Sequence, residues 1–436
     1  MPDSNAPAFA NRPSFRDALL FWLKLGFISF GGPAGQIAIM QTELVDRRRW
    51  IDQGAFLRGL TFCTLLPGPE AQQLATYIGW RLHGTLGGIV AGGLFVLPGA
   101  ILLFVLSWIA AAGRDAAVIG AIFYGLKPVV IAIVAHAVLR VGKRALKTSQ
   151  AMALAAVAFA AIHFAGIDFP WIVLAAGLIG WMLGRSGTSP FAVGGHAPAE
   201  DEGFVETTPR LGGPRRTAIL IGVFLGLWAA PVAAVIWFMG TLPFADIADL
   251  FTKAAFVTFG GAYAVLPYVA DAAVNHYGWL SPGDMLNGMA LAETTPGPLI
   301  LVLQYVGFFA GWNNPGVHSP LFAASVAAFL TTYVTFLPSF LFILTGAPYV
   351  DSLHENKAVG SALGAVTAAV VGVILNLAVF LAEGVFVPAA GRVDWIAIVM
   401  AATAFAVLLR FKIAIHWLVV AGAALGLILR LAVSGG

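Results

Sequence analysis

The chain has almost no cysteine and very little charge. Cys63 is the single cysteine among 436 residues, which excludes an internal disulfide and any cysteine-based metal cluster. Only 10% of the residues are charged and 59% are hydrophobic, a composition that no water-soluble domain of this length has. Enzyme motifs are missing too, since there is no HExxH, no GxSxG and no phosphate-binding loop. We therefore expect no enzyme, no metal, no cofactor and no nucleic-acid partner.

Long apolar runs recur along the whole chain. Continuous runs of about eighteen residues or more are typical of helices that cross a lipid bilayer. The sequence therefore predicts an all-α polytopic membrane protein. The predicted parts are a polar tail at 1–14, a first repeat at 15–184, a flexible linker at 185–216, a lone membrane helix at 217–240 and a second repeat at 241–436.

Two stretches that lie 229 residues apart carry the same glycine and proline pattern. KLGFISFGG at 24–32 matches KAAFVTFGG at 253–261, and the PGP at 67–69 matches the PGP at 296–298 without a gap. Glycine and proline interrupt membrane helices, so their repetition in register predicts a helix break that is made twice. Duplicated folds with broken helices near the membrane midplane are typical of secondary transporters.

Positive charge is distributed unequally between the repeats. The loops of the first repeat carry Arg47, Arg48, Arg49 and Arg58, whereas no lysine or arginine lies between 254 and 356. Because cationic loops are retained in the cytoplasm, the two repeats are predicted to have inverted topology, with the N-terminus and the linker cytoplasmic. Re-entrant hairpins at 15–46 and 54–82 fit this rule better than full crossings, and both alternatives are kept.

Each glycine–proline turn can end one half-helix and begin another. Proline fits the first position of a helix, and glycine allows the tight backbone before it. The new N-terminus offers free amide groups and about half a positive charge, which suits an anion. The turn residues predicted to surround the anion are Gly31, Gly32, Gly260, Gly261, Pro67, Gly68, Pro69, Pro296, Gly297 and Pro298. The alternative is a simple proline kink, which the repetition in register disfavours.

Lys24 and Lys253 occupy equivalent positions ahead of the two FGG turns. An ammonium group within apolar sequence is unfavourable unless it meets a negative group, so the pair is predicted to balance the charge of an anionic substrate. The alternative is that each side chain reaches out to the lipid headgroups. Ser29 and Thr258 are also equivalent and are candidate donors, although such hydroxyls often bond to their own helix.

Polar residues beside the PGP turns complete the candidate site. Gln72 and Gln304 follow the two turns and are candidate neutral donors, or they join helices to one another. Glu70 follows the first turn and Glu293 precedes the second. Buried carboxylates in transporters often carry protons, so both are candidates for proton coupling. For Glu70 the alternative is a favourable interaction with the N-terminus of its helix.

Four motifs at matching spacing carry a family resemblance. They are FGGPAGQ at 30–36, LLPGPEAQQLATYIGW at 65–80, FGGAYAVLPYV at 259–269 and TPGPLILVLQYVGFFAG at 295–311. Together they resemble the chromate ion transporter family in its long, two-domain form, from about residue 15 to the C-terminus. The resemblance implies about thirteen crossings in two oppositely oriented halves, as in other inverted-repeat transporters. It also implies chromate export driven by the membrane potential or a proton gradient, and chromate resistance.

The residues and the resemblance together predict a secondary transporter that exports chromate across the inner (cytoplasmic) membrane. Sulfate has the same charge and shape as chromate, so a transporter of sulfate or another oxyanion is kept as an alternative. An anion channel is a second alternative, because the sequence does not distinguish a carrier from a continuous pore. The oligomeric state stays open, with a homodimer as one of the alternatives.

Overall fold

A computed structural model of the chain describes residues 13–30, 32–186, 189–191, 213–350, 357–387, 392–411, 413 and 415–434. Gly31 and most of the predicted tail and linker lie outside the described residues. Every regular element within those ranges is a helix, which confirms the predicted all-α class.

In the first half, short helices precede long ones. They are α1 (Phe15–Ile28), α2 (Gly32–Gln41), the π-helical turn η1 (Thr42–Arg47), α3 (Gln53–Leu65), α4 (Glu70–Ala112), α5 (Ala117–Ala145), α6 (Ser149–His163) and α7 (Phe169–Arg185). At 1.5 Å per residue α1 extends only about 21 Å, less than the roughly 30 Å of a hydrocarbon core. Elements this short favour re-entrant hairpins over full crossings.

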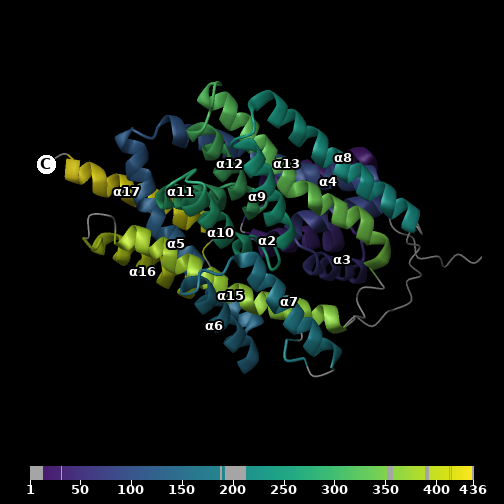
Figure 1. Cartoon of the computed structure of the whole chain (residues 1–436). Helices are drawn as coiled ribbons and strands as arrows, with labels where there is room; N and C mark the ends of the chain where they lie inside the picture. The colour runs from purple at the N-terminus through teal and green to yellow at the C-terminus, as the bar shows by residue number, and fades with distance from the viewer. Residues whose placement is uncertain are drawn as a thin grey trace, which may run out of the picture.

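The second half follows helix α8 (Pro214–Met239) and repeats this order. Its elements are α9 (Phe244–Val257), α10 (Ala262–Asp271), the π-helical turn η2 (Ala272–His276), α11 (Pro282–Thr294), η3 (Leu299–Leu301), α12 (Val302–Asn313), α13 (Pro320–Gly346), η4 (Ala347–Tyr349), α15 (Lys357–Phe386), α16 (Trp395–Arg410) and α17 (Ile415–Ser434). Figure 1 shows α8 along the outer edge of the molecule, and α8 contacts α13 and α9.

Among the described residues, five helices are long and apolar enough to cross a membrane, namely α4, α5, α8, α13 and α15. They identify the chain as a multi-pass helical membrane protein. The figure of about thirteen crossings stays a prediction, because several of the remaining apolar helices are shorter than about eighteen residues.

Helix α4 contains a break just after residue 82, where the predicted hairpin at 54–82 ends. His83 and Gly84 leave the helical conformation, and Gly84 has a φ of +65°. The corresponding place in the second half is the loop between α12 and α13. The same interruption is therefore made by a glycine kink in one half and by a loop in the other.

Backbone hydrogen bonds recur at the spacing of the sequence repeat. The amide of Trp50 donates to the carbonyl oxygen of Leu44 at 2.8 Å, and the amide of Trp279 donates to that of Ala273 at 2.8 Å. Both bonds close the chain after a π-helical turn, η1 in one half and η2 in the other. The two halves are thus built alike in their local structure.

The halves also pack on each other reciprocally. Helix α5 contacts α16 and α17 of the second half, whereas α15 contacts α6 and α7 of the first half. Figure 1 shows α17 beside α5, and α7 beside α15. Because α5 and α15 hold corresponding places in the two halves, this exchange of partners is what a pseudo-two-fold relation produces.

Candidate anion-binding centre

Each FGG sequence breaks a helix, as predicted. The breaks separate α1 from α2 and α9 from α10. At these breaks Gly32, Gly260 and Gly261 have φ values of +74°, +79° and +98°. Residues other than glycine rarely adopt this backbone conformation. Gly31, the remaining predicted turn glycine, lies outside the described residues.

Each PGP sequence also interrupts the helical path. The turn at 67–69 separates α3 from α4, and the turn at 296–298 separates α11 from η3 and α12. Gly68 and Gly297 have φ values of +127° and +95°. A glycine with positive φ between two prolines gives a turn rather than a kink, so the simple proline-kink alternative does not describe these segments.

The two kinds of break meet across the halves. The amide of Gly68 donates to the carbonyl oxygen of Thr258 at 2.7 Å, and the amide of Gly297 donates to that of Ser29 at 2.8 Å. Exchanging the halves converts one bond into the other, because both pairs of equivalent residues are separated by the repeat spacing. We call these four residues the turn crossing.

Several helix N-termini lie next to the turn crossing. Helices α2, α4 and α10 each begin within a few residues of it. The first turn of a helix leaves its amide groups without intrahelical partners and carries about half a positive charge. The amides of Gly68 and Gly297 are already used by carbonyl oxygens, so the first turns are the donors that can attract an anion.

The two predicted hydroxyl donors lie at the turn crossing but bond to their own helices. The hydroxyl of Ser29 donates to the carbonyl oxygen of Leu25 at 2.6 Å, and that of Thr258 donates to Ala254 at 2.5 Å. Both residues are fully buried. Their protons stabilise the ends of α1 and α9, which is the alternative that hydroxyls in membrane helices commonly follow.

Gln36 on α2 is a central residue that the sequence does not single out. Its side chain is fully buried, and its Nε2 donates to the carbonyl oxygens of Ser29 at 3.1 Å and Gly297 at 2.6 Å. The amide therefore ties α2 to the PGP turn of the opposite half. The equivalent residue in the second half is Val265, which has no side-chain amide. The contact between Gly68 and Thr258 therefore lacks a corresponding hydrogen bond. In the sequence, the only indication of this role of Gln36 is that the motif FGGPAGQ ends in a polar residue.

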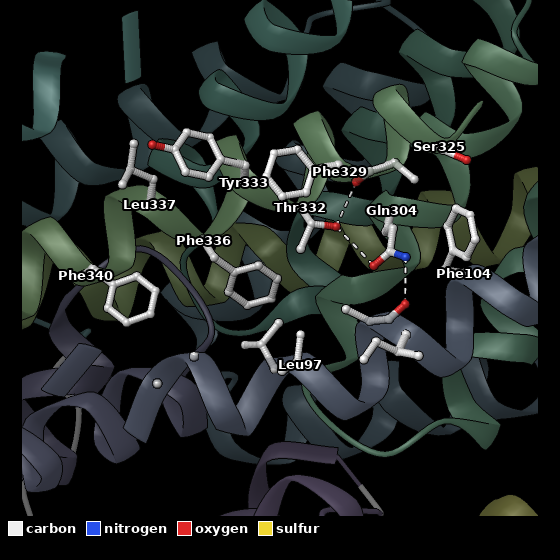
Figure 2. A pocket seen from close by; sticks show the side chains of 16 residues that line it. Leu97, Phe104, Gln304, Ser325, Phe329, Thr332, Tyr333, Phe336, Leu337 and Phe340 are labelled. Atoms are coloured by element: carbon white, nitrogen blue, oxygen red, sulfur yellow. Dashed lines mark hydrogen bonds between the residues drawn. The ribbon is translucent and has the colours of Figure 1, made fainter. Parts of the chain in front are cut away.

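Of the two predicted glutamines, Gln304 joins helices to one another, whereas Gln72 bonds within its own helix. Nε2 of Gln304 donates to the carbonyl oxygen of Ala100 at 2.8 Å, and its Oε1 accepts from Thr332 at 3.0 Å (Figure 2). Gln304 thus links α12 to α4 and α13. Nε2 of Gln72 lies 3.1 Å from the hydroxyl oxygen of Thr76 and donates to it. The buried Oε1 of Gln72 has no partner among the described residues.

The two predicted carboxylates lie near positive charge from α5. The phenol of Tyr263 donates a hydrogen bond to Glu293. Arg140 acts electrostatically on Glu293, and Arg144 acts on Glu70. The two arginines are one helical turn apart on α5, so a single helix directs positive charge toward both carboxylates.

Both predicted lysines are exposed. The side chain of Lys253 is 60% exposed, and its Nζ lies 2.6 Å from a carboxylate oxygen of Asp249. Lys24 lines a pocket of about 600 Å³ together with Asp17 and Arg48. No hydrogen bond within the described ranges joins either lysine to the turn crossing. A charge-balancing role beside the anion therefore stays a prediction, and these contacts favour the headgroup alternative.

The basic loop after α2 is held by a local ion pair. Glu43 accepts hydrogen bonds from Arg47 at 2.7 Å and from Arg48 at 3.3 Å. Burial raises the pKa of the Glu43 carboxyl, but these hydrogen bonds and charges outweigh it and the net pKa is lowered. The guanidinium of Arg48 also lies 5.0 Å from the ring centroid of Trp50.

Long apolar helices around paired helix breaks define a multi-pass membrane protein with the broken helices of a transporter. Among the described residues no group of His, Cys, Asp and Glu is arranged to hold a metal. The sequence profile of the chromate transporter family matches residues 16–181 and 245–427, and the chain belongs to this family. The resemblance inferred from the four motifs is thereby confirmed. The family is one of transport proteins and not of enzymes.

Relatives of two lengths match the chain. A chromate transport protein of Pseudomonas aeruginosa is 32% identical over 87% of this chain and 84% of that protein. A chromate transport protein of Cupriavidus metallidurans is 27% identical over 97% of this chain and 96% of that protein. The uncharacterized transporter YwrB of Bacillus subtilis is 31% identical over 31% of this chain but 69% of its own length. No solved structure matches the chain.

Proposed function

We propose that the chain is a secondary active transporter that exports chromate across the cytoplasmic membrane and so confers chromate resistance. The observation that carries the proposal is the turn crossing, where breaks from both halves meet in reciprocal hydrogen bonds. Two relatives that span most of the chain are named chromate transport proteins, which supports chromate as the anion. The alternatives are transport of sulfate or another oxyanion, and an anion channel.

In this proposal the anion binds against the first turns of the helices that begin at the turn crossing. Their amide groups donate to its oxygens, and the positive helix ends oppose its charge. The glycines at 32, 260 and 261 let the backbone approach closely because they carry no side chain. Arg140 and Arg144 add positive charge from α5, near the two carboxylates.

We further propose that the halves have inverted topology and that one half rocks against the other around the turn crossing. The N-terminus and the 185–216 linker are then cytoplasmic. Two observations support this arrangement. Lysine and arginine are missing between 254 and 356, and α5 and α15 exchange partners between the halves.

Uptake of radiolabelled chromate into inverted membrane vesicles tests the proposed function. Energised vesicles that contain the protein are expected to accumulate chromate, and collapse of the gradient is expected to release it. Excess sulfate should inhibit this uptake only weakly. Equilibration without accumulation would instead indicate a channel, and accumulation of labelled sulfate without chromate would change the substrate.

Proton coupling through Glu293 is tested in the same vesicles. Glu293→Gln removes the ionisable group but keeps an oxygen that accepts from Tyr263. If this carboxylate carries the proton, a pH gradient should no longer drive accumulation in the variant, whereas downhill exchange should persist. Glu383→Gln is the matched control, because Glu383 is exposed near the end of α15. Unchanged proton-driven accumulation in Glu293→Gln would leave Glu70 as the remaining candidate.

The lysine pair is tested by Lys24→Ala and Lys253→Ala. If the ammonium groups oppose the charge of the anion, each variant should lose transport while the folded protein is retained. Asp249→Asn separates the two roles of Lys253, because it removes the ion pair but keeps the ammonium group. Full transport by both lysine variants would assign the lysines to the headgroup region.

A further inference from the structure

A pocket of about 480 Å³ lies between α4 and α13, with Gln304 of α12 at one end (Figure 2). Helix α4 belongs to the first half and α13 to the second, so the pocket lies at the seam between the halves. Its volume falls within the range of about 300–1,000 Å³ that small-molecule sites have. Figure 2 shows Leu97, Phe336 and Phe340 around the space.

The polar groups of this seam pocket are already used by the chain. Its hydroxyl groups donate to oxygens of the protein, Ser325 to Leu321 at 2.6 Å, Thr332 to Gln304 at 3.0 Å and Tyr333 to Leu227 at 2.6 Å. The amide of Gln304 donates to Ala100. Among the described residues that line the pocket, only the second N–H of the Gln304 amide is left as a donor. One neutral donor does not offset the burial of an oxyanion's charge, so an oxyanion would be strongly unfavourable here. The occupant that fits is a flexible apolar chain that needs no hydrogen bonds.

The opening of the seam pocket faces the hydrocarbon region. Leu97, Ile101 and Phe329 line the pocket and are 48%, 57% and 67% exposed. They lie on α4 and α13, two of the helices that are long and apolar enough to cross a membrane. Large apolar side chains exposed on such helices contact lipid tails, so the molecules beside the opening are phospholipids.

The polar groups that line the seam pocket bond to oxygens of the protein, and the opening of the pocket faces lipid. We therefore propose that the seam pocket binds one acyl chain of a membrane phospholipid. The acyl chain lies between helices of opposite halves, and α4 also contacts the second PGP turn, through Gly99, which is not among the residues that line the pocket. That contact is close, because a Cβ on Gly99 would lie 2.1 Å from the carbonyl oxygen of Pro296. The bound chain therefore sets the spacing of the two halves beside the turn crossing.

The test uses purified protein in vesicles of phosphatidylethanolamine and phosphatidylglycerol doped with a phosphatidylcholine that carries a diazirine at the end of one acyl chain. After irradiation, mass spectrometry is expected to find the label concentrated on residues 92–104 and 325–340. Gly93→Leu adds a side chain at a residue that lines the pocket, and its Cβ meets no atom within 4 Å. It should reduce labelling of these segments by about tenfold, as the loss of a specific site requires.

Two further variants complete the test. Ser325→Leu fills the pocket from α13 and should act as Gly93→Leu does, so the result does not depend on one variant folding. Gly222→Leu on α8 is the matched control, because a Cβ there also meets no atom within 4 Å but lies outside the pocket. Labelling spread evenly over the lipid-facing helices, or unchanged by both filling variants, would overturn the proposal. Neither readout depends on which anion is transported.

Discussion

Gly297→Ala is expected to reduce chromate accumulation in inverted vesicles at least about tenfold, because it strains the backbone and weakens the hydrogen bonds of the turn crossing. The φ of Gly297 is +95°, which an alanine adopts only with strain. Relief of that strain would rotate the peptide groups on both sides of the residue. The amide that donates to Ser29 and the carbonyl that accepts from Gln36 would both be displaced.

Gly316→Ala is the matched control for this prediction. Gly316 also has a positive φ, of +61°, and a Cβ there meets no atom within 4 Å, but it lies in the loop between α12 and α13. It should carry similar strain without loss of transport. Equal loss in both variants, or a wild-type rate in Gly297→Ala with equal amounts of folded protein, would contradict a role for the turn crossing.

Gln36→Leu is expected to lower transport by about tenfold, because it removes two buried hydrogen bonds at the turn crossing. Leucine has a similar volume, so packing around the site should change little. The carbonyl oxygen of Gly297 would lose the donor that ties it to α2. Initial rates of uptake, divided by the amount of folded protein in the vesicles, measure the effect.

Gln41→Leu on the same helix serves as the control for Gln36. Among the described residues, the amide of Gln41 makes only an exposed contact of 3.3 Å with Gln53, so transport should stay close to that of the wild type. Parallel loss in both variants would mean that α2 is simply sensitive to apolar substitution. Normal uptake by Gln36→Leu would mean that the tie between α2 and the opposite half has no part in transport.

The helix breaks could be predicted from the sequence because their causes are local. The FGG and PGP turns lie where predicted, and their glycines have positive φ. The predicted hairpin at 54–82 likewise ends beside a break, which a glycine kink within α4 makes. Glycine and proline act through the backbone of their own position, so no knowledge of distant contacts is needed.

The contacts of the candidate site could not be predicted in the same way. Helical periodicity places residues on faces but does not say which distant backbone each face meets. The tie from Gln36 to Gly297 depends on a contact between positions 261 residues apart. The exposure of Lys24 and Lys253 depends likewise on which face of α1 and α9 is covered.

The sequence by itself determined the membrane class, the duplicated helix breaks and the family, because composition, backbone chemistry and motif spacing are properties of the chain alone. The tertiary structure decided which breaks meet. In it, Gly68 bonds to Thr258 and Gly297 bonds to Ser29. The hydroxyl groups of Ser29 and Thr258 donate to carbonyl oxygens of their own helices. Those choices follow from packing between the halves, because a buried backbone group must find its partner wherever the fold brings one within reach.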